Sequence, residues 1–124
     1  MPSLIVSSGA QEGLFLPLGK KTSVIGRDEA LPLQLEDEKV SRRHVQIRFE
    51  PSDSRYRALD MKSTNGTLYN GRAVTTEVVL SEGDEIQVGD TRLLFTMEDP
   101  ADRPNALAVL KKVGERRRST LMKP

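Results

Sequence analysis

The sequence predicts an all-β fold, an antiparallel sandwich or barrel, followed by a short C-terminal helix. Three observations lead to this prediction. Short apolar runs recur between turn-forming residues, one segment alternates between apolar and polar residues, and an Asn-Gly pair stands between two apolar stretches. Each apolar run is too short for an independent helix, whereas many short strands at this spacing are typical of antiparallel sandwiches and barrels.

The first three expected strands are brief apolar runs, each bounded by Gly, Pro or Ser. They are LIVSS at 4–8, LFLPL at 14–18 and TSVIG at 22–26. Gly and Pro interrupt regular structure and Ser favours turns, so these residues mark the ends of the runs. The turn-forming residues between the runs therefore predict three separate strands rather than one longer element.

Residues 45–49 form the clearest expected strand. Val45, Ile47 and Phe49 fall on one face, because successive side chains of a strand point to opposite sides. The segment therefore predicts a strand that buries one face and leaves the other polar. The polar face is expected to carry His44, Gln46 and Arg48.

Three further segments complete the expected sheets. RYRALDM at 55–61 is one strand. TLYNGRAV at 67–74 holds the pair Asn70-Gly71, which predicts a two-residue hairpin, since a type I′ turn needs positive φ at both central positions. DEIQVGDTRLLFTM at 84–97 predicts two strands joined around a Gly-Asp turn. Their inward-facing side chains are expected to be Ile86, Val88, Leu93, Phe95 and Met97.

The character of the sequence changes after the last of these strands. EDPADRP at 98–104 has two prolines and four charged residues, which predicts a linker. A short helix is expected beyond it, from an Asn105 N-cap to a Gly114 stop, and its apolar stripe should dock on the sandwich or on a partner. The expected organisation is a sandwich domain at 1–99, then a linker, short helix and basic tail at 100–124. The stripe consists of Ala106, Leu107, Leu110 and Val113.

Charge is distributed unevenly along the chain. Residues 1–102 carry 12 basic and 17 acidic side chains, a net charge of −5, whereas residues 103–124 carry seven basic and one acidic, a net charge of +6. The acidic body argues against nucleic acid as a partner, although the basic tail is suited to an acidic one. Cysteine is absent, which fits a reducing, cytoplasmic compartment. No signal peptide or membrane-spanning run is present, so no membrane association is expected.

Three polar clusters interrupt the apolar pattern: GRDE at 26–29, SRRH at 41–44 and STNGT at 63–67. Each alone is compatible with an ordinary strand end or turn. Loops at one end of a sandwich converge, however, and together the clusters offer guanidinium groups, hydroxyls and backbone N–H groups, a donor set expected to contain no carboxylate. Such donors are suited to a dianionic tetrahedral group, because charge-assisted hydrogen bonds to phosphate oxygens are strong. The clusters therefore predict a phosphate-binding site.

The order of four motifs resembles the forkhead-associated (FHA) family, whose members read phosphorylated motifs. The resemblance extends over residues 4–98 and implies a β-sandwich of about eleven strands, with apical loops that bind phosphothreonine peptides and with no metal or cofactor. The motifs are IGR at 25–27, SRRH at 41–44, STNGT at 63–67 and LYNG at 68–71.

The family resemblance also implies roles for individual residues. Asn65 matches an asparagine that holds the peptide main chain, and His44 matches a histidine whose ring nitrogens brace neighbouring loops. Arg43 is either a phosphate contact or a charge at the strand edge. The residues implied to contact the phosphopeptide are Arg27, Ser41, Arg42, Ser63, Thr64, Asn65 and Asn70. Those implied to support the site are Gly26, His44 and Gly66.

The leading functional hypothesis is a phosphothreonine-dependent adaptor in serine/threonine kinase signalling, with a phosphorylated protein or peptide and a protein kinase as partners. The alternative is a phosphate-independent structural or assembly protein that self-associates through its sheet face or C-terminal segment. An enzyme is disfavoured, because the sequence shows no general base, metal set or P-loop glycine pattern. RRRST at 116–120 makes Thr120 a candidate phosphosite that the same loops would bind, in cis or in a neighbouring molecule.

Overall fold

The structure is a computed structural model that describes the backbone of residues 1–122 and the side chains of residues 1–114. Over these residues, ten strands and one helix confirm the predicted fold class, with ten strands where about eleven were expected. In chain order they are β1 (Ser3–Val6), β2 (Phe15–Pro17), β3 (Ser23–Ile25), β4 (Val45–Glu50), β5 (Arg55–Asp60), β6 (Thr67–Tyr69), β7 (Arg72–Ala73), β8 (Val78–Val79), β9 (Glu85–Val88), β10 (Thr91–Thr96) and α1 (Arg103–Met122).

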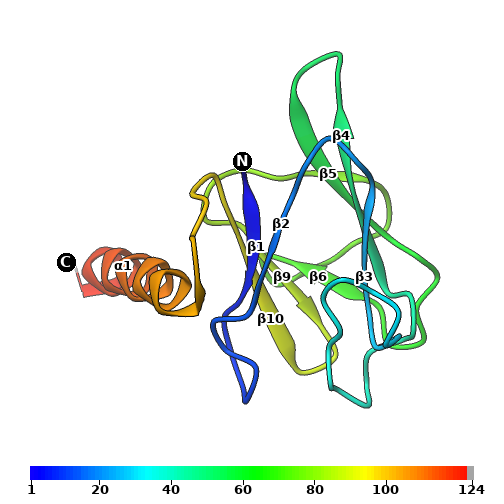
Figure 1. The fold of residues 1–124 in the computed structure, drawn as a ribbon, viewed down its shortest axis with the longest axis horizontal. Coiled ribbons are helices and arrows are strands. Elements are labelled where there is room, and N and C mark those ends of the chain that lie inside the picture. The colour runs from blue at the N-terminus through cyan, green and yellow to red at the C-terminus, as the bar shows by residue number, and fades with distance from the viewer. Residues whose placement is uncertain (123–124) are drawn as a thin grey trace.

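The strands form two antiparallel sheets (Figure 1). One sheet has six strands in the order β2-β1-β10-β9-β6-β7, and the other has four in the order β3-β4-β5-β8. A continuous apolar core fills the space between them, because every second side chain of the facing strands is apolar. Its most buried members include Leu4, Ile25, Ile47, Ile86 and Phe95.

The alternating segment folds as predicted on its apolar face. Val45 and Ile47 of β4 are buried in the core, and Phe49 is half-buried against it. His44 does not follow the alternation, since its side chain is 0% exposed although the pattern placed it on the polar face with Gln46. It lies just before β4, and hydrogen bonds hold both of its ring nitrogens. A buried imidazole with both nitrogens bonded carries no unsatisfied polar group.

The Asn-Gly hairpin is confirmed. It joins β6 to β7 and pairs Tyr69 with Arg72. The φ angles of Asn70 and Gly71 are 48° and 85°, as a type I′ turn requires.

Two features of the sheets differ from the sequence pattern. β8 was not predicted, because a two-residue strand has too little alternation to be recognised; its pairing with β5 defines it. Met97 was expected to face inward but is 58% exposed, because β10 ends one residue earlier, at Thr96.

α1 begins earlier and ends later than the sequence predicted. Asp102, rather than Asn105, is the N-cap: its Oδ1 accepts the Asn105 N–H at 3.0 Å. The stop at Gly114 is wrong, since the helix continues to Met122. A glycine inside a helix costs only about 1 kcal/mol relative to alanine, so glycine alone does not end one. No helix in the described part of the chain is long and apolar enough to cross a membrane.

α1 docks on the outer face of the six-stranded sheet, beside β1 and β2 (Figure 1). All four residues of β1 are buried: Leu4 and Val6 lie in the main core, and Ile5 packs against the helix. Arg103 fixes the start of the helix, because it donates two hydrogen bonds to the Glu12 carbonyl, at 2.9 and 2.6 Å. Leu107 was placed in the apolar stripe, yet it is 40% exposed. The small second core consists of Ile5, Leu94, Ala106 and Val109.

Candidate functional site

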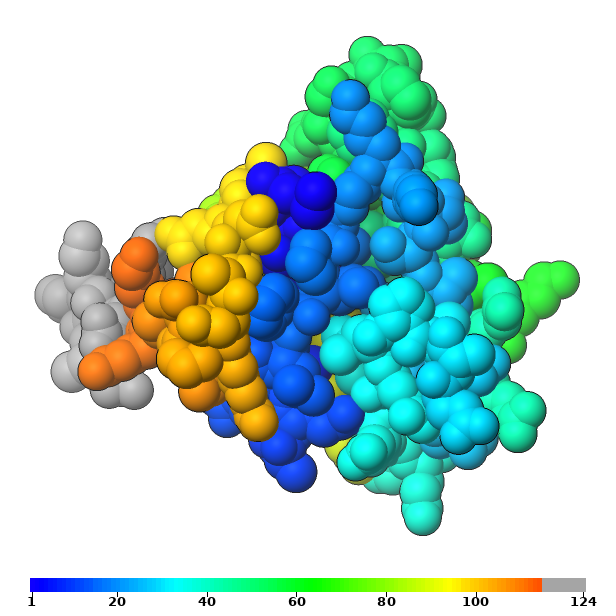
Figure 2. Space-filling view, viewed as in Figure 1, coloured from blue at the N-terminus to red at the C-terminus, as the bar shows by residue number. Residues whose placement is uncertain are grey.

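The three polar clusters lie on two loops that are neighbours in space. Residues 26–44 connect β3 to β4, and residues 61–66 connect β5 to β6. The Met61 N–H donates to the His44 carbonyl at 2.8 Å, so the loops are joined where they leave the sheet. In Figure 2 the longer loop, in cyan, forms the lower right of the surface. The loop end of the four-stranded sheet therefore gathers the clusters at one place.

Arg27 lies just after β3, and hydrogen bonds hold both its backbone and its side chain. Its N–H donates to the Ser41 carbonyl at 3.0 Å, and its Nε donates to the Val40 carbonyl at 3.0 Å. Neither terminal guanidinium nitrogen has a partner among the described residues. One edge of the guanidinium is thus fixed, and the other faces solvent and is available to an anion.

Arg42 and Arg43 are exposed, and neither side chain forms an ion pair or hydrogen bond with another described residue. By contrast, Arg48 and Arg57 of the four-stranded sheet are both paired with carboxylates. Arg42 lines a hollow of about 330 Å³ together with Arg27, whereas Arg43 does not contribute to it. Within the described part of the chain, the arginines at the loop end of the sandwich thus have no carboxylate partner.

Ser41 and Thr64 place hydroxyl groups beside these arginines. The Ser41 Oγ accepts the Thr64 N–H at 3.1 Å, which leaves the Ser41 hydroxyl hydrogen free to donate. The Thr64 side chain is exposed and has no partner among the described residues. The two residues thus offer donors at the junction of the two loops.

Asn65 is tied to the longer loop through one end of its amide. Its Nδ2 donates to the Lys39 carbonyl at 2.8 Å. Its Oδ1 has no partner among the described residues and remains able to accept a hydrogen bond from a peptide backbone.

Ser63 and Asn70 are more fully engaged within the chain. The Ser63 hydroxyl donates to Asp60 at 2.5 Å and accepts the Gly66 N–H at 2.9 Å. The Asn70 Nδ2 donates to Asp84 at 3.1 Å, and the Asn70 Oδ1 accepts the backbone N–H of Glu85 at 2.8 Å. Both side chains therefore shape turns, and the structure does not bring their polar groups to the open surface beside Arg27.

His44 bridges the two loops. The Ser41 N–H donates to Nδ1 at 3.0 Å, so Nδ1 is an unprotonated acceptor and the ring proton lies on Nε2. Nε2 then donates to the Gly66 carbonyl at 2.7 Å. The nearest carboxylate oxygen, on Asp60, is 3.9 Å from Nε2, which is beyond hydrogen-bonding distance. The neutral ring thus sets the distance between Ser41 and the turn that follows β5.

Two glycines allow the loops to approach. A Cβ at Gly26 would lie 2.1 Å from the Arg42 carbonyl oxygen, a distance that no side chain tolerates. Gly66 has a φ of 78°, in the left-handed region that favours glycine. Both positions are backbone requirements of the site rather than sources of ligand contacts.

Asp37 supports the site and was not predicted from the sequence. Its carboxylate accepts the Lys39 N–H at 2.9 Å and the hydroxyl of Thr91, the first residue of β10, at 2.8 Å. These bonds anchor the segment whose carbonyls orient Arg27 and Asn65. The sequence signal is an Asp two residues before the residue whose backbone N–H it accepts, which is the pattern of an Asx turn.

Replacing Asp60 with asparagine is expected to make the fold less sensitive to acid. Partial burial raises the pKa of Asp60, but hydrogen bonds from Ser63 and Thr67 lower it by more, so the net pKa is lowered. A carboxylate whose pKa is lower in the folded than in the unfolded state stabilises the native state at pH values above its unfolded-state pKa of about 4. This contribution is lost as the pH falls through the folded-state pKa. Urea unfolding at pH 7 and pH 3 should show a smaller loss of stability in Asp60→Asn than in the wild type.

Glu12→Gln is the matched control for this experiment. Glu12 is an exposed carboxylate whose side chain has no partner among the described residues. The control should lose as much stability on acidification as the wild type. An equal loss in Asp60→Asn and the wild type would contradict the prediction.

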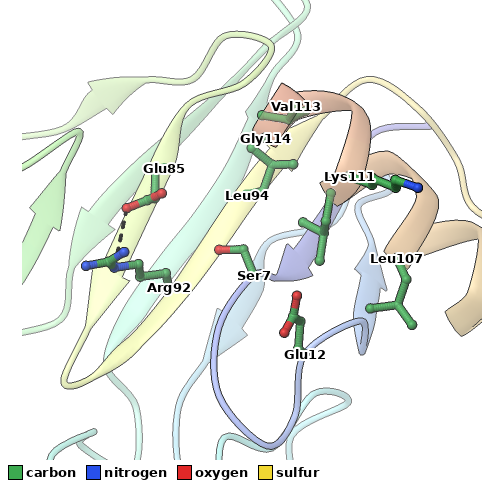
Figure 3. A pocket seen from close by; sticks show the side chains of 10 residues that line it. Ser7, Glu12, Glu85, Arg92, Leu94, Leu107, Lys111, Val113 and Gly114 are labelled. Carbon is green, nitrogen blue, oxygen red and sulfur yellow. Dashed lines mark ion pairs between the residues drawn. The ribbon is translucent and has the colours of Figure 1, made fainter. Parts of the chain in front are cut away.

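A second hollow, of about 420 Å³, lies between α1 and the six-stranded sheet (Figure 3). Its positive groups are Lys111 and Arg92, and the Arg92 Nε lies 3.8 Å from the Glu85 carboxylate. Glu12 and the apolar Leu94 also line it. Because Arg92 is already paired with a carboxylate here, whereas neither Arg27 nor Arg42 pairs with one among the described residues, this hollow is less suited to a phosphate. Within the described residues, no cluster of His, Asp or Glu is arranged to hold a metal ion.

Comparison with known proteins identifies the family. The model of the FHA domain matches residues 23–89, more than half of the chain. The chain belongs to the FHA-domain family. This FHA chain is 38% identical over 92 residues to an oxoglutarate dehydrogenase inhibitor of Corynebacterium diphtheriae, which covers 74% of the chain and 62% of the relative.

A regulator and a solved structure are also similar to this FHA chain. It is 35% identical over 99 residues to the glycogen accumulation regulator GarA of Mycolicibacterium smegmatis, covering 80% of the chain and 61% of that protein. The chain thus spans less than two thirds of these curated relatives. A solved FHA domain, described for its phosphothreonine-dependent interactions, is 31% identical with a TM-score of 0.69, and the match covers 79% of this chain and 97% of that domain.

Proposed function

We propose that this FHA domain binds phosphothreonine-containing segments of partner proteins and acts as a phosphorylation-dependent adaptor in serine/threonine kinase signalling. The observation that carries the proposal is the pair Arg27 and Arg42, whose terminal guanidinium nitrogens have no partner among the described residues, beside the hydroxyls of Ser41 and Thr64. Guanidinium forks bind phosphate oxygens through paired, charge-assisted hydrogen bonds. The solved relative described for phosphothreonine-dependent interactions supports the same function.

The donors at the loop end are sufficient for a regulatory affinity. Each charge-assisted hydrogen bond contributes about 1.5–3 kcal/mol net. Two or three such bonds provide most of the 8 kcal/mol or so that corresponds to a micromolar dissociation constant. Contacts with the peptide backbone supply the remainder, and the free Oδ1 of Asn65 is placed to make one of them.

The proposed function is binding rather than catalysis, and the proposed compartment is the cytoplasm. His44 accepts the Ser41 N–H through Nδ1 and is not bonded to the Ser41 Oγ, so it does not activate that hydroxyl as a nucleophile. The relatives named above are an inhibitor and a regulator. The absence of cysteine fits a reducing compartment. The proposed partners are a phosphothreonine protein and the kinase that modifies it.

The alternative, phosphate-independent assembly through α1, has less support. Ala106 is buried against the six-stranded sheet and Leu110 and Val113 pack partly buried beside it, so most of the apolar stripe is not available to a second copy. Leu107 alone stays substantially exposed. The candidate phosphosite Thr120 lies outside the residues whose side chains are described, and its modification stays a prediction.

A degenerate phosphothreonine peptide library tests the proposed function, with threonine and phosphoserine versions as controls. The protein is expected to retain phosphothreonine peptides and to release the unphosphorylated ones. Phosphoserine peptides should bind more weakly, because they lack the γ-methyl group, whose burial contributes about 0.8 kcal/mol. Equal retention of phosphorylated and unphosphorylated peptides would show that the phosphate is not what the site reads.

A further inference from the structure

The hollow that contains the phosphate-binding arginines also has an acidic side. Arg27 and Arg42 line it together with Asp28, Glu29 and Gln34, and its volume is about 330 Å³. We call it the bipolar hollow. Both acids belong to the GRDE cluster of the sequence, and the structure places them in the same hollow as the two arginines.

The two acids do not neutralise the two arginines. No ion pair or hydrogen bond joins either acid to Arg27 or Arg42. The Asp28 Oδ1 accepts the Ala30 N–H at 3.0 Å, which fixes this carboxylate in a turn and leaves Oδ2 unpaired. Glu29 is exposed, and its carboxylate has no partner among the described residues. Both signs of charge in the hollow are therefore open to a ligand.

A common backbone frame holds the two sides in place. The Asp28 N–H donates to the Arg42 carbonyl at 3.2 Å, so the acidic segment is tied to the basic one. The Gln34 Nε2, which also lines the hollow, donates to the Arg27 carbonyl at 3.1 Å. The acids thus stay beside the arginines, rather than on a segment that moves away from them.

We propose that the bipolar hollow selects phosphothreonine segments that carry a lysine or arginine close to the phosphothreonine. This inference rests on the proposed function and adds to it the charge of the partner sequence. A phosphate on Arg27 and Arg42 places the neighbouring ligand residues beside Glu29, which attracts a cation and repels an acid. The enzyme that supplies such ligands is then a kinase that prefers basic residues near its target threonine.

A charge scan of one peptide tests the inference. The probe is a phosphothreonine peptide in a neutral background, with a single arginine, or a single glutamate, moved through the four positions on each side. Fluorescence polarisation with the full chain measures the affinity of each version. At one or more positions arginine should strengthen binding about threefold over the neutral peptide, as expected for an exposed ion pair, and glutamate should weaken it. This gain should shrink at high salt.

Variants of the acids assign the effect to the hollow. The ratio of affinities for the arginine and neutral peptides should fall to about one in Glu29→Gln and to an intermediate value in Asp28→Asn, which keeps the bond to Ala30. Glu29→Lys should reverse the preference toward the glutamate peptide. Glu12→Gln removes a carboxylate beside α1 and should keep the wild-type ratio.

The outcomes separate this inference from the proposed function. A neutral phosphopeptide that binds better than its unphosphorylated form, without any position that prefers arginine, overturns the inference alone. A preference that persists unchanged in both Glu29→Gln and Asp28→Asn also overturns it. Equal affinity for phosphorylated and unphosphorylated peptides overturns both the inference and the proposed function.

Discussion

Arg27→Ala is expected to lower the affinity for a phosphothreonine peptide about 100-fold or more. The substitution removes both terminal guanidinium nitrogens that face the open surface, and each lost charge-assisted hydrogen bond weakens binding by about 1.5–3 kcal/mol. It also removes the Nε bond to the Val40 carbonyl, which holds the neighbouring loop. Isothermal titration of a phosphothreonine peptide against the wild type and the variant measures the loss.

Two further variants define what Arg27 contributes. Arg27→Lys keeps the charge but loses the planar fork and the Nε bond, so its affinity should lie between those of the wild type and Arg27→Ala. Arg92→Ala removes an exposed arginine from the outer face of the six-stranded sheet and should bind like the wild type. An Arg27→Ala protein that keeps wild-type affinity would exclude Arg27 as a phosphate contact.

His44→Ala is expected to reduce both stability and peptide affinity. The imidazole is completely buried, and its loss leaves the Ser41 N–H and the Gly66 carbonyl without their partner. Each unsatisfied group costs about 1–3 kcal/mol, and the cavity adds to this, so unfolding should become easier by about 3–5 kcal/mol. Urea unfolding measures the stability, and titration of the folded fraction measures the affinity.

Leu80→Ala separates the two effects of this substitution. Leu80 is a buried core residue whose backbone N–H donates to the Tyr56 carbonyl. Tyr56 lies near the start of β5, at the opposite end of the strand from Asp60. Its truncation should cost a comparable 2–5 kcal/mol while the folded protein keeps its affinity. If folded His44→Ala also binds like the wild type, the histidine stabilises the fold without positioning Ser41.

The sheets could be predicted because their signals are local. Turn residues separate the apolar runs, and the Asn70-Gly71 pair specifies its hairpin by requiring positive φ at both positions. The errors arise where tertiary contacts decide. Met97 continues an apolar alternation but lies beyond the last ladder bond, and α1 passes through Gly114 because nothing after it opposes a helix.

The candidate site could be predicted only in part. The arginines and hydroxyls stand out in the sequence because their clusters interrupt apolar runs. The groups that orient these side chains do not stand out in the sequence. Val40 and Lys39 act through their backbone carbonyls, which any residue would supply. Asp28 and Glu29 were visible beside Arg27, yet only the path of the loop shows that they share a hollow with Arg42.

The most direct test of the account is an NMR titration of the ¹⁵N-labelled protein with a phosphothreonine peptide and its unphosphorylated form. The largest shifts are expected at the Arg27 Nε–H and at the backbone amides of Ser41, Arg42 and Thr64, with the phosphorylated peptide only. Shifts confined to the hollow under α1, around Leu94 and Leu107, or equal shifts with both peptides, would contradict it.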